Sequence, residues 1–205
     1  MDLQSSVVLL KRENRQIQKL AQAMSEAFYH EPNFRYIIHD DEKRLTNLQW
    51  FNMFTLRLGM KYGEVYSTDQ ATGGAVWIKP GNNIGFVGAI QEGLLMMPFK
   101  FGWQSFRRSM QLNQELEQIR KESFPSTHWY LTALAVHPSM QGKGIGGALI
   151  KPVLKMADKS KTSCYAETFK AVNISFYEKL GFQVWEEGQI HRNGPKFWVL
   201  VRKPL

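Results

Sequence analysis

Cysteine is almost absent from this chain: Cys164 is the single one among 205 residues. An intrachain disulfide is therefore impossible, and such usage fits a reducing compartment, so we expect a cytoplasmic protein. Cys164 lies in a run, residues 163–166, that is expected to be a strand. We therefore predict a buried, unreactive thiol and not a nucleophile.

Long hydrophobic segments are also missing. The most apolar stretch, residues 84–103, is interrupted by Gln91, Glu92, Pro98 and Lys100, so a membrane-spanning helix is not expected. Near the start of the chain, an acidic residue stands where a signal peptide is basic, and the first apolar run is too short for the core of one. We therefore predict no membrane partner.

Metal-ligand patterns and nucleic-acid signals are lacking as well. The five histidines and one cysteine show no metal-ligand spacing, so no metal site is predicted. The formal net charge of +8 attracts polyanions but does not say which one. Lys and Arg are scattered and are not interleaved with aromatic residues, so we predict no nucleic-acid partner.

What the chain does have is material for a core, with 43% hydrophobic and 13% aromatic residues. These values predict one α/β domain over residues 1–205. Apolar spacing and the positions of glycine and proline predict strands at 7–10, 64–68, 74–78, 128–136, 162–168, 182–186 and 196–202, and helices at 13–28, 41–62, 144–158 and 172–180. Further helices are expected within residues 82–122, broken at Pro98. Pro32 should interrupt the helical pattern, and Pro152 should kink the helix that contains it.

The most informative segment is a glycine-rich turn, residues 141–147, between a predicted strand and a predicted helix. Glycine allows positive φ and close approach of a ligand, and a helix start offers free N–H groups to an anion. A P-loop is excluded because Gly144 follows Lys143 where Ser or Thr is needed. The dinucleotide pattern G-x-G-x-x-G fits Gly142, Gly144 and Gly147, but too few residues follow for a doubly wound sheet.

A third pattern, Q/R-x-x-G-x-G/A, is satisfied by Gln141, Gly144 and Gly146. With it the chain resembles the GNAT superfamily of acyl-coenzyme A-dependent N-acyltransferases. The likeness continues in Tyr165-Ala166-Glu167-Thr168 and in residues 173–182, which resemble the family's N-x-x-F-Y-E-x-L-G-F ending. Residues 128–205 are also similar to puromycin N-acetyltransferase and its relatives. Upstream of residue 128 only residues 75–81 can be placed.

This resemblance implies a three-layer α/β/α domain with a central mixed, splayed sheet. The strands ending at Val136 and starting near Ser163 should be parallel and separate where acetyl-coenzyme A enters. Backbone groups and side chains are implied to bind the cofactor at Leu134, Ala135, Val136, Gln141, Gly142, Lys143, Gly144, Ile145, Gly146, Gly147, Asn173 and Phe176.

Two side chains are implied to be catalytic. Tyr177 would protonate the departing thiolate, with Phe176 packed into the core beside it, and Glu167 would act as a base or amine-binding group. The alternatives are that Tyr177 only packs at the edge of the core and that Glu167 faces solvent or forms a salt bridge. Asn173 could be a helix N-cap. His128 and His137 are expected to be structural.

The implied reaction is transfer of an acetyl group from acetyl-coenzyme A to a primary amine of a small molecule, with antibiotic-like amines as candidates, by a monomer or homodimer. The acceptor pocket is expected to be lined by residues 82–106 and to lie near Tyr130 and Glu167, with the helices of residues 82–122 as its cover. The alternatives are a peptide or protein amine, which needs an open groove, and a non-catalytic acyl-coenzyme A-binding module.

Overall fold

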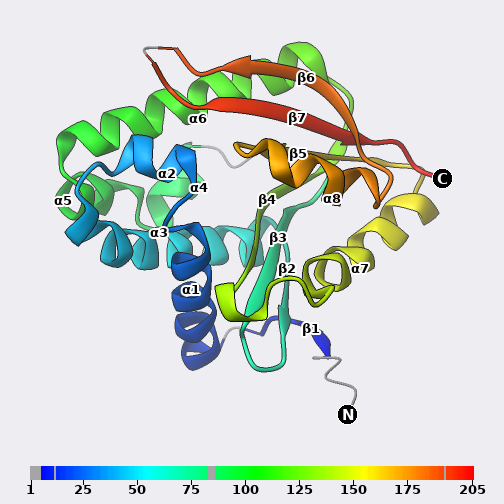
Figure 1. The fold of residues 1–205 in the computed structure, drawn as a ribbon, viewed down its shortest axis with the longest axis horizontal. Helices are drawn as coiled ribbons and strands as arrows, with labels where there is room; N and C mark the ends of the chain where they lie inside the picture. Colours follow the sequence, from blue (N-terminus) through cyan, green and yellow to red (C-terminus); the bar gives the residue numbers. More distant parts are fainter. Residues whose placement is uncertain (1–5, 12, 83–85, 192) are drawn as a thin grey trace.

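The computed structural model describes residues 6–11, 13–82, 86–191 and 193–205, and it is built on a single seven-stranded sheet (Figure 1). The strands run in the order β1-β2-β3-β4-β5-β7-β6. Only β4 and β5 pair in parallel, and the other neighbours are antiparallel. The strands are β1 (Val7–Leu9), β2 (Gly63–Thr68), β3 (Gly73–Ile78), β4 (His128–Val136), β5 (Ser163–Thr168), β6 (Gln183–Gln189) and β7 (Lys196–Arg202).

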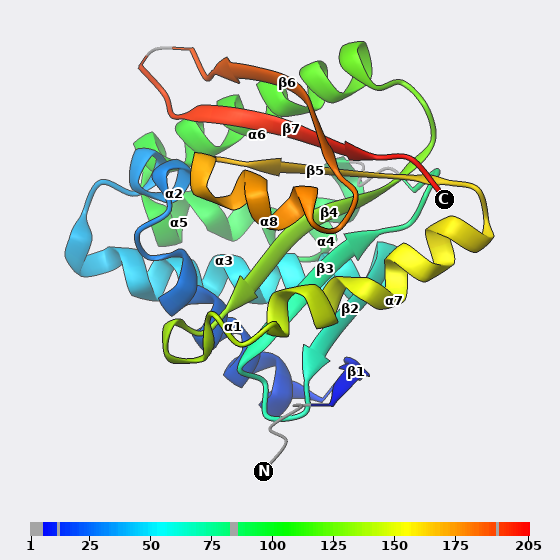
Figure 2. The same cartoon turned by 45° about the vertical axis from the view of Figure 1, so that its right-hand side comes forward.

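Helices cover both faces of this sheet, which gives the three layers that were predicted (Figure 2). The α-helices are α1 (Asn14–Phe28), α2 (Pro32–Ile37), α3 (Asp41–Tyr62), α4 (Phe86–Gln91), α5 (Met97–Phe101), α6 (Trp103–Ser123), α7 (Ile145–Lys159) and α8 (Ile174–Glu178). Short 3₁₀ turns are η1 (Leu94–Met96), η2 (Pro138–Met140) and η3 (Ala171–Asn173). Buried apolar residues join α1 and α3 to β2, β3 and β4 on one face, and join α7 and α8 to β3, β4, β5 and β7 on the other.

The breaks in the segment before β4 differ from the prediction. Pro98 does not end a helix, because it occupies the first turn of α5, where a missing N–H is tolerated. The chain turns instead at Gly93 and Gly102, which have φ of 112° and 78°, values that glycine adopts readily. Pro32 likewise starts α2. Residues 83–85, at the start of the predicted helical segment, lie outside the described residues.

Helix α7 runs through Pro152 as one helix from Ile145 to Lys159. Its buried residues recur at helical spacing and pack on the sheet. Proline removes one backbone hydrogen bond, and the packed apolar face keeps the helix continuous across that loss. Cys164 of β5 is fully buried, and burial raises the pKa of its thiol to about 12. The prediction of an unreactive thiol is confirmed.

The two parallel strands separate along their length, as predicted. Their pairing ends at Leu131 and Ala166, although β4 continues to Val136 and β5 to Thr168. On its other side β4 stays paired with β3, with a register shift between Val76 and Trp77. That shift leaves Thr132 as an extra residue in β4, and such a bulge bends the strand that contains it. The bulge therefore accounts for the divergence of β4 from β5.

Candidate active site

The glycine-rich turn joins the end of β4 to the start of α7. Gly142 and Gly144 have φ of 76° and 77°, a region that other residues rarely adopt. The Gln141 side chain crosses the turn, and its Nε2 donates to the carbonyl of Val136 at 3.0 Å. Lys143 folds over the turn, with its Nζ donating to the carbonyl of Ser139 at 3.2 Å. These contacts fix the loop in one conformation.

The backbone of this turn offers donors. Among the hydrogen bonds of the described residues, none uses a backbone N–H from the stretch 142–147. Ala148, the next residue, donates to the carbonyl of Gly144 and so begins the helical pattern. A helix start with free N–H groups and a positive dipole end binds anions. The turn therefore fits a pyrophosphate, although the roles assigned to its individual residues stay predictions.

Phe176 packs against the core, as predicted, and its ring also lies beside this turn. A Cβ added to Gly146 would lie 3.3 Å from the Phe176 ring, so glycine at this position allows the ring to approach the first turn of α7. Phe176 is half-buried, whereas the next residue, Tyr177, is buried. The reason is the direction of α8, which turns Tyr177 toward Phe182 beneath it, at 5.5 Å between ring centroids.

The outer part of β4 forms an open edge at the split. Leu134, Ala135 and Val136 pair with β3 on one side, and they have no ladder partner toward β5 because the parallel pairing has ended. An unpaired strand edge can bind an extended ligand by main-chain hydrogen bonds. This geometry fits the predicted role of these residues toward the pantetheine arm.

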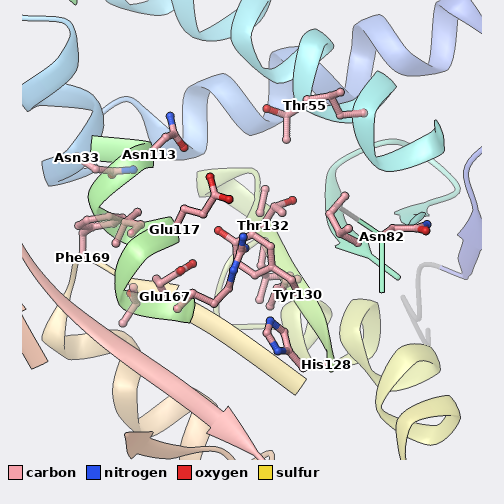
Figure 3. A pocket seen from close by; sticks show the side chains of 18 of the residues that line it. Asn33, Thr55, Asn82, Asn113, Glu117, His128, Tyr130, Thr132, Glu167 and Phe169 are labelled. Atoms are coloured by element: carbon pink, nitrogen blue, oxygen red, sulfur yellow. The ribbon is translucent and has the colours of Figure 1, made fainter. Parts of the chain in front are cut away.

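A cavity of about 780 Å³ opens beside the split (Figure 3). Its walls come from α1, α2, α3, α4, α6 and α8, from the end of β3, and from β4 and β5 where they diverge. Figure 3 shows Glu117 from α6, Tyr130 and Thr132 from β4, and Glu167 from β5 pointing toward its centre. Within the described residues, the segment 82–106 contributes only Asn82, Ala89 and Leu94. The pocket prediction was therefore right about the strands but underrated α3 and α6, whose sequences carry no motif.

Glu167 faces this cavity and not the outer solvent. Burial raises the pKa of its carboxyl to about 7, against the opposing influence of Arg120 and of the Tyr130 and Tyr165 hydroxyls. Its Oε1 is buried and has no hydrogen-bond partner among the described residues, and no salt bridge of those residues includes it. Among the described residues the ion-paired alternative is therefore wrong, and the carboxyl is partly buried at the cavity wall. A carboxyl group with a pKa near 7 is suited to take up a proton at neutral pH.

Tyr177 lines the same cavity from α8 and is only 6% exposed. Burial raises the pKa of its phenol, with smaller contributions from Glu31 and Glu167. A phenol, with an ordinary pKa of about 10, is already a weaker acid than a thiol at about 8.5, and burial widens this gap. Complete proton transfer from Tyr177 to a thiolate is therefore uphill, so a hydrogen bond to the sulfur is the role that this environment favours.

Asn173 lies between β5 and α8 and also lines the cavity. Its Nδ2 donates to Thr168 Oγ1 at 2.9 Å, and its side chain makes no cap hydrogen bond to α8. The N-cap alternative is thus wrong for the side chain, because its Oδ1 accepts no backbone N–H of α8. The hydrogen bond holds this amide between β5 and the helix that carries Tyr177.

The two histidines differ in position. His128 lines the cavity, packs on Tyr165 at 5.1 Å between ring centroids, and has its pKa lowered mainly by burial. His137 lies outside the cavity, and its two ring nitrogens contact Glu26 at 2.6 Å and Ser139 at 2.8 Å. These contacts fit structural roles for both rings.

Arg120 is a charged residue of the cavity that sequence reasoning missed. It lies near the end of α6, with its guanidinium 4.4 Å from the centre of the Tyr130 ring. No motif marks Arg120, because its contact with Tyr130 joins a helix to a separate strand and arises only when the two pack together.

No group of metal-ligating side chains occurs among the described residues, and none of the helices formed by these residues is long and apolar enough to cross a bilayer.

Comparisons with known proteins agree with this geometry. The model of the acetyltransferase (GNAT) family matches residues 29–182. Two probable serine/threonine-protein kinases of Dictyostelium discoideum are 33% identical over 79 residues and 22% identical over 191 residues, or 38% and 84% of this chain. The chain spans 11% and 20% of the length of these curated relatives.

Solved structures share the fold. A histone acetyltransferase HPA2 and related acetyltransferase from Corynebacterium glutamicum is 20% identical, with a TM-score of 0.69 over 98% of this chain and 97% of that one. A Drosophila melanogaster polyamine N-acetyltransferase that forms N-acetylagmatine has 14% identity, a TM-score of 0.61, and coverage of 97% and 100%. A chain of the NatC complex bound to Gag peptide and CoA has 13% identity, a TM-score of 0.52, and coverage of 98% of both chains.

The split sheet, the glycine turn and the match over most of the sequence define the class: this chain belongs to the GNAT family of acetyltransferases. The donor that this family uses is acetyl-coenzyme A.

Proposed function

We propose that this protein is an N-acetyltransferase that transfers the acetyl group of acetyl-coenzyme A to the primary amine of a small molecule. The observation that carries the proposal is Glu167, a carboxyl group with a pKa raised to about 7 by burial, facing a cavity at the point where β4 and β5 part. An ammonium must lose a proton before its nitrogen can attack, and such a carboxylate can accept it.

Bound acetyl-coenzyme A would supply the thioester carbonyl; the C–S bond breaks as the C–N bond forms, and the released thiolate becomes a thiol by taking the second proton that the nitrogen loses on forming the amide. The free N–H groups of residues 142–147 would hold its pyrophosphate, and the open edge of residues 134–136 its pantetheine arm. Glu167 takes the proton of the acceptor amine, directly or through water. Tyr177 donates a hydrogen bond where the sulfur departs, which is favourable because a bare thiolate is costly in a partly dry site. Asn173 and Phe176 position this end of α8.

The size of the cavity favours a small acceptor. Sites for small molecules usually enclose about 300–1,000 Å³, and the cavity of about 780 Å³ falls in this range. Aromatic side chains from α1, α2, α3 and β4 form much of its wall. The motif likeness of residues 128–205 to puromycin N-acetyltransferase makes antibiotic-like amines a first set to screen.

The direct test is release of free thiol from acetyl-coenzyme A with a panel of small amines and peptides. Turnover of small amines with saturable kinetics is expected. Turnover of peptides alone would assign the protein to peptide acetylation. Binding of acetyl-coenzyme A without turnover of any amine would favour the non-catalytic module.

A further inference from the structure

The charged side chains of the cavity are almost all paired. Glu31 binds Lys170 at 2.7 Å, Glu117 binds Lys121 at 2.8 Å, and Lys79 binds Glu64 at 3.4 Å. This list covers the charged lining residues except Glu167 and Arg120, whose side chains form no salt bridge within 4.0 Å with any described residue. Judged by the part of the chain that the structure describes, the cavity therefore offers one unpaired acidic group and one unpaired cation.

Arg120 is held in place without a carboxylate. Its guanidinium lies 4.4 Å from the centre of the Tyr130 ring, and no hydrogen bond of the described residues uses its N–H groups. A guanidinium stacked on an aromatic face keeps its outer N–H groups directed at a planar anion, which it can bind in a bidentate manner. Arg120 also opposes the rise in the pKa of Glu167 more than any other charged group does, so the two groups are close but not paired.

We propose that Arg120 is a specificity-determining residue that binds an acidic group, a carboxylate or a phosphate, carried by the acceptor amine. The inference rests on the proposed function. The acceptor is then a molecule that carries both an amine and an anionic group. The amine lies at Glu167, and the anionic group pairs with the guanidinium of Arg120. Amines without an acidic group would leave the partly buried Arg120 guanidinium without an anionic partner, so they would lose the hydrogen bonds that the acid-bearing acceptors gain.

The experiment compares matched acceptors in the thiol-release assay. The pairs are phenylalanine with phenethylamine, tyrosine with tyramine, and phosphoethanolamine with ethanolamine, which differ by the acidic group. The variants are Arg120→Met, Arg120→Lys and, as the matched control, Arg107→Met, which removes an exposed cation from the same helix outside the cavity. Assays at a pH of about 9 keep Glu167 ionised in every variant.

We expect the acid-bearing member of at least one pair to have the higher kcat/KM in the wild-type protein. Arg120→Met should reduce that value by about 10- to 100-fold, the usual worth of a hydrogen bond to a charged group, and leave the acid-free member unchanged. Arg120→Lys should keep part of the preference, and Arg107→Met all of it. The melting temperature of each variant is to be measured as a check that the variant is folded.

Two results would overturn the inference and leave the proposed function intact: preferential turnover of the acid-free members, or an equal loss for both members in Arg120→Met. The carboxylate and phosphate pairs separately identify which anion is bound. If no member of any pair is acetylated while acetyl-coenzyme A still binds, the proposed function itself fails, and the inference fails with it.

Discussion

The two sides of the split sheet are built in different ways. The side proposed to bind the cofactor consists of consecutive residues, from the bulge in β4 through the glycine turn to the first turn of α7, and it presents mainly backbone groups. The acceptor side collects side chains from residues as distant as Phe28 and Tyr177. A backbone site depends on local φ angles, whereas the cavity depends on the packing of helices and strands that are distant in the chain. Substitutions on the two sides should therefore affect different measurements.

The largest expected effect lies on the acceptor side, at Glu167. Glu167→Gln keeps the shape of the side chain but removes its ability to accept a proton. General acid–base groups contribute about 10²–10⁴-fold, so we expect kcat/KM to fall by this range. Affinity for acetyl-coenzyme A, measured by titration calorimetry, should stay unchanged. An equal loss of affinity for acetyl-coenzyme A would show that the two sides of the split sheet do not act independently.

The dependence of kcat/KM on pH also tests Glu167 as the proton acceptor. Since Glu167 must be ionised to accept a proton and its pKa is raised to about 7, kcat/KM should fall about tenfold per unit as pH drops below 7. In Glu167→Gln this limb should vanish. A limb with its midpoint near the ordinary value for glutamate would show that the carboxyl is not buried during turnover.

Tyr177→Phe comes next. The hydroxyl has no hydrogen-bond partner among the described residues, so its removal leaves no buried group unpaired and the melting temperature should stay near that of the wild type. Because the raised pKa favours a hydrogen bond over full proton transfer, we expect kcat to fall by about 10²-fold, the lower end for such groups. Full activity in this variant would remove Tyr177 from the mechanism.

On the cofactor side, Gly144→Val should weaken binding of acetyl-coenzyme A. Gly144 has φ of 77°, and forcing another residue into this region costs about 1–2 kcal/mol, more for a β-branched one. We expect at least a roughly tenfold loss of affinity, by calorimetry. Gly102→Val is the matched control, because Gly102 has φ of 78° but lies outside the turn. A similar loss of affinity in this control would show that general destabilisation explains the effect.

The smallest expected effect is on stability. Here Glu167→Gln should be favourable, although the same substitution should lower activity. A carboxyl with a raised pKa holds its proton more firmly in the folded state than in the unfolded state. It therefore destabilises the fold increasingly as pH rises from 4.5 to about 7, and the destabilisation stays constant above that pH. Glu167→Gln should therefore raise the melting temperature above pH 7 by roughly a few degrees and have no such effect at pH 4. A lowered melting temperature above pH 7 would contradict the buried environment of Glu167.

Much of the fold followed from the sequence. The apolar spacing predicted α3 over residues 41–62 and β4 over 128–136 with the bounds that the structure shows. Apolar periodicity and local turn residues specify these elements without reference to the rest of the chain. The breaks at Gly93 and Gly102 were not predicted, because a proline in a helical pattern is the stronger sign of a break. Proline nevertheless fits the first turn of a helix, and these two glycines adopt positive φ angles.

The sequence by itself determined the turn of residues 141–147 and the parallel strands on either side of α7, because consecutive residues create both. Only the tertiary structure decided which groups meet in the cavity. Glu167 faces inward because of its place on β5, and Arg120 reaches Tyr130 because α6 packs across the sheet. It also decided their chemistry, since a pKa near 7 for Glu167 arises from burial by elements distant in the chain.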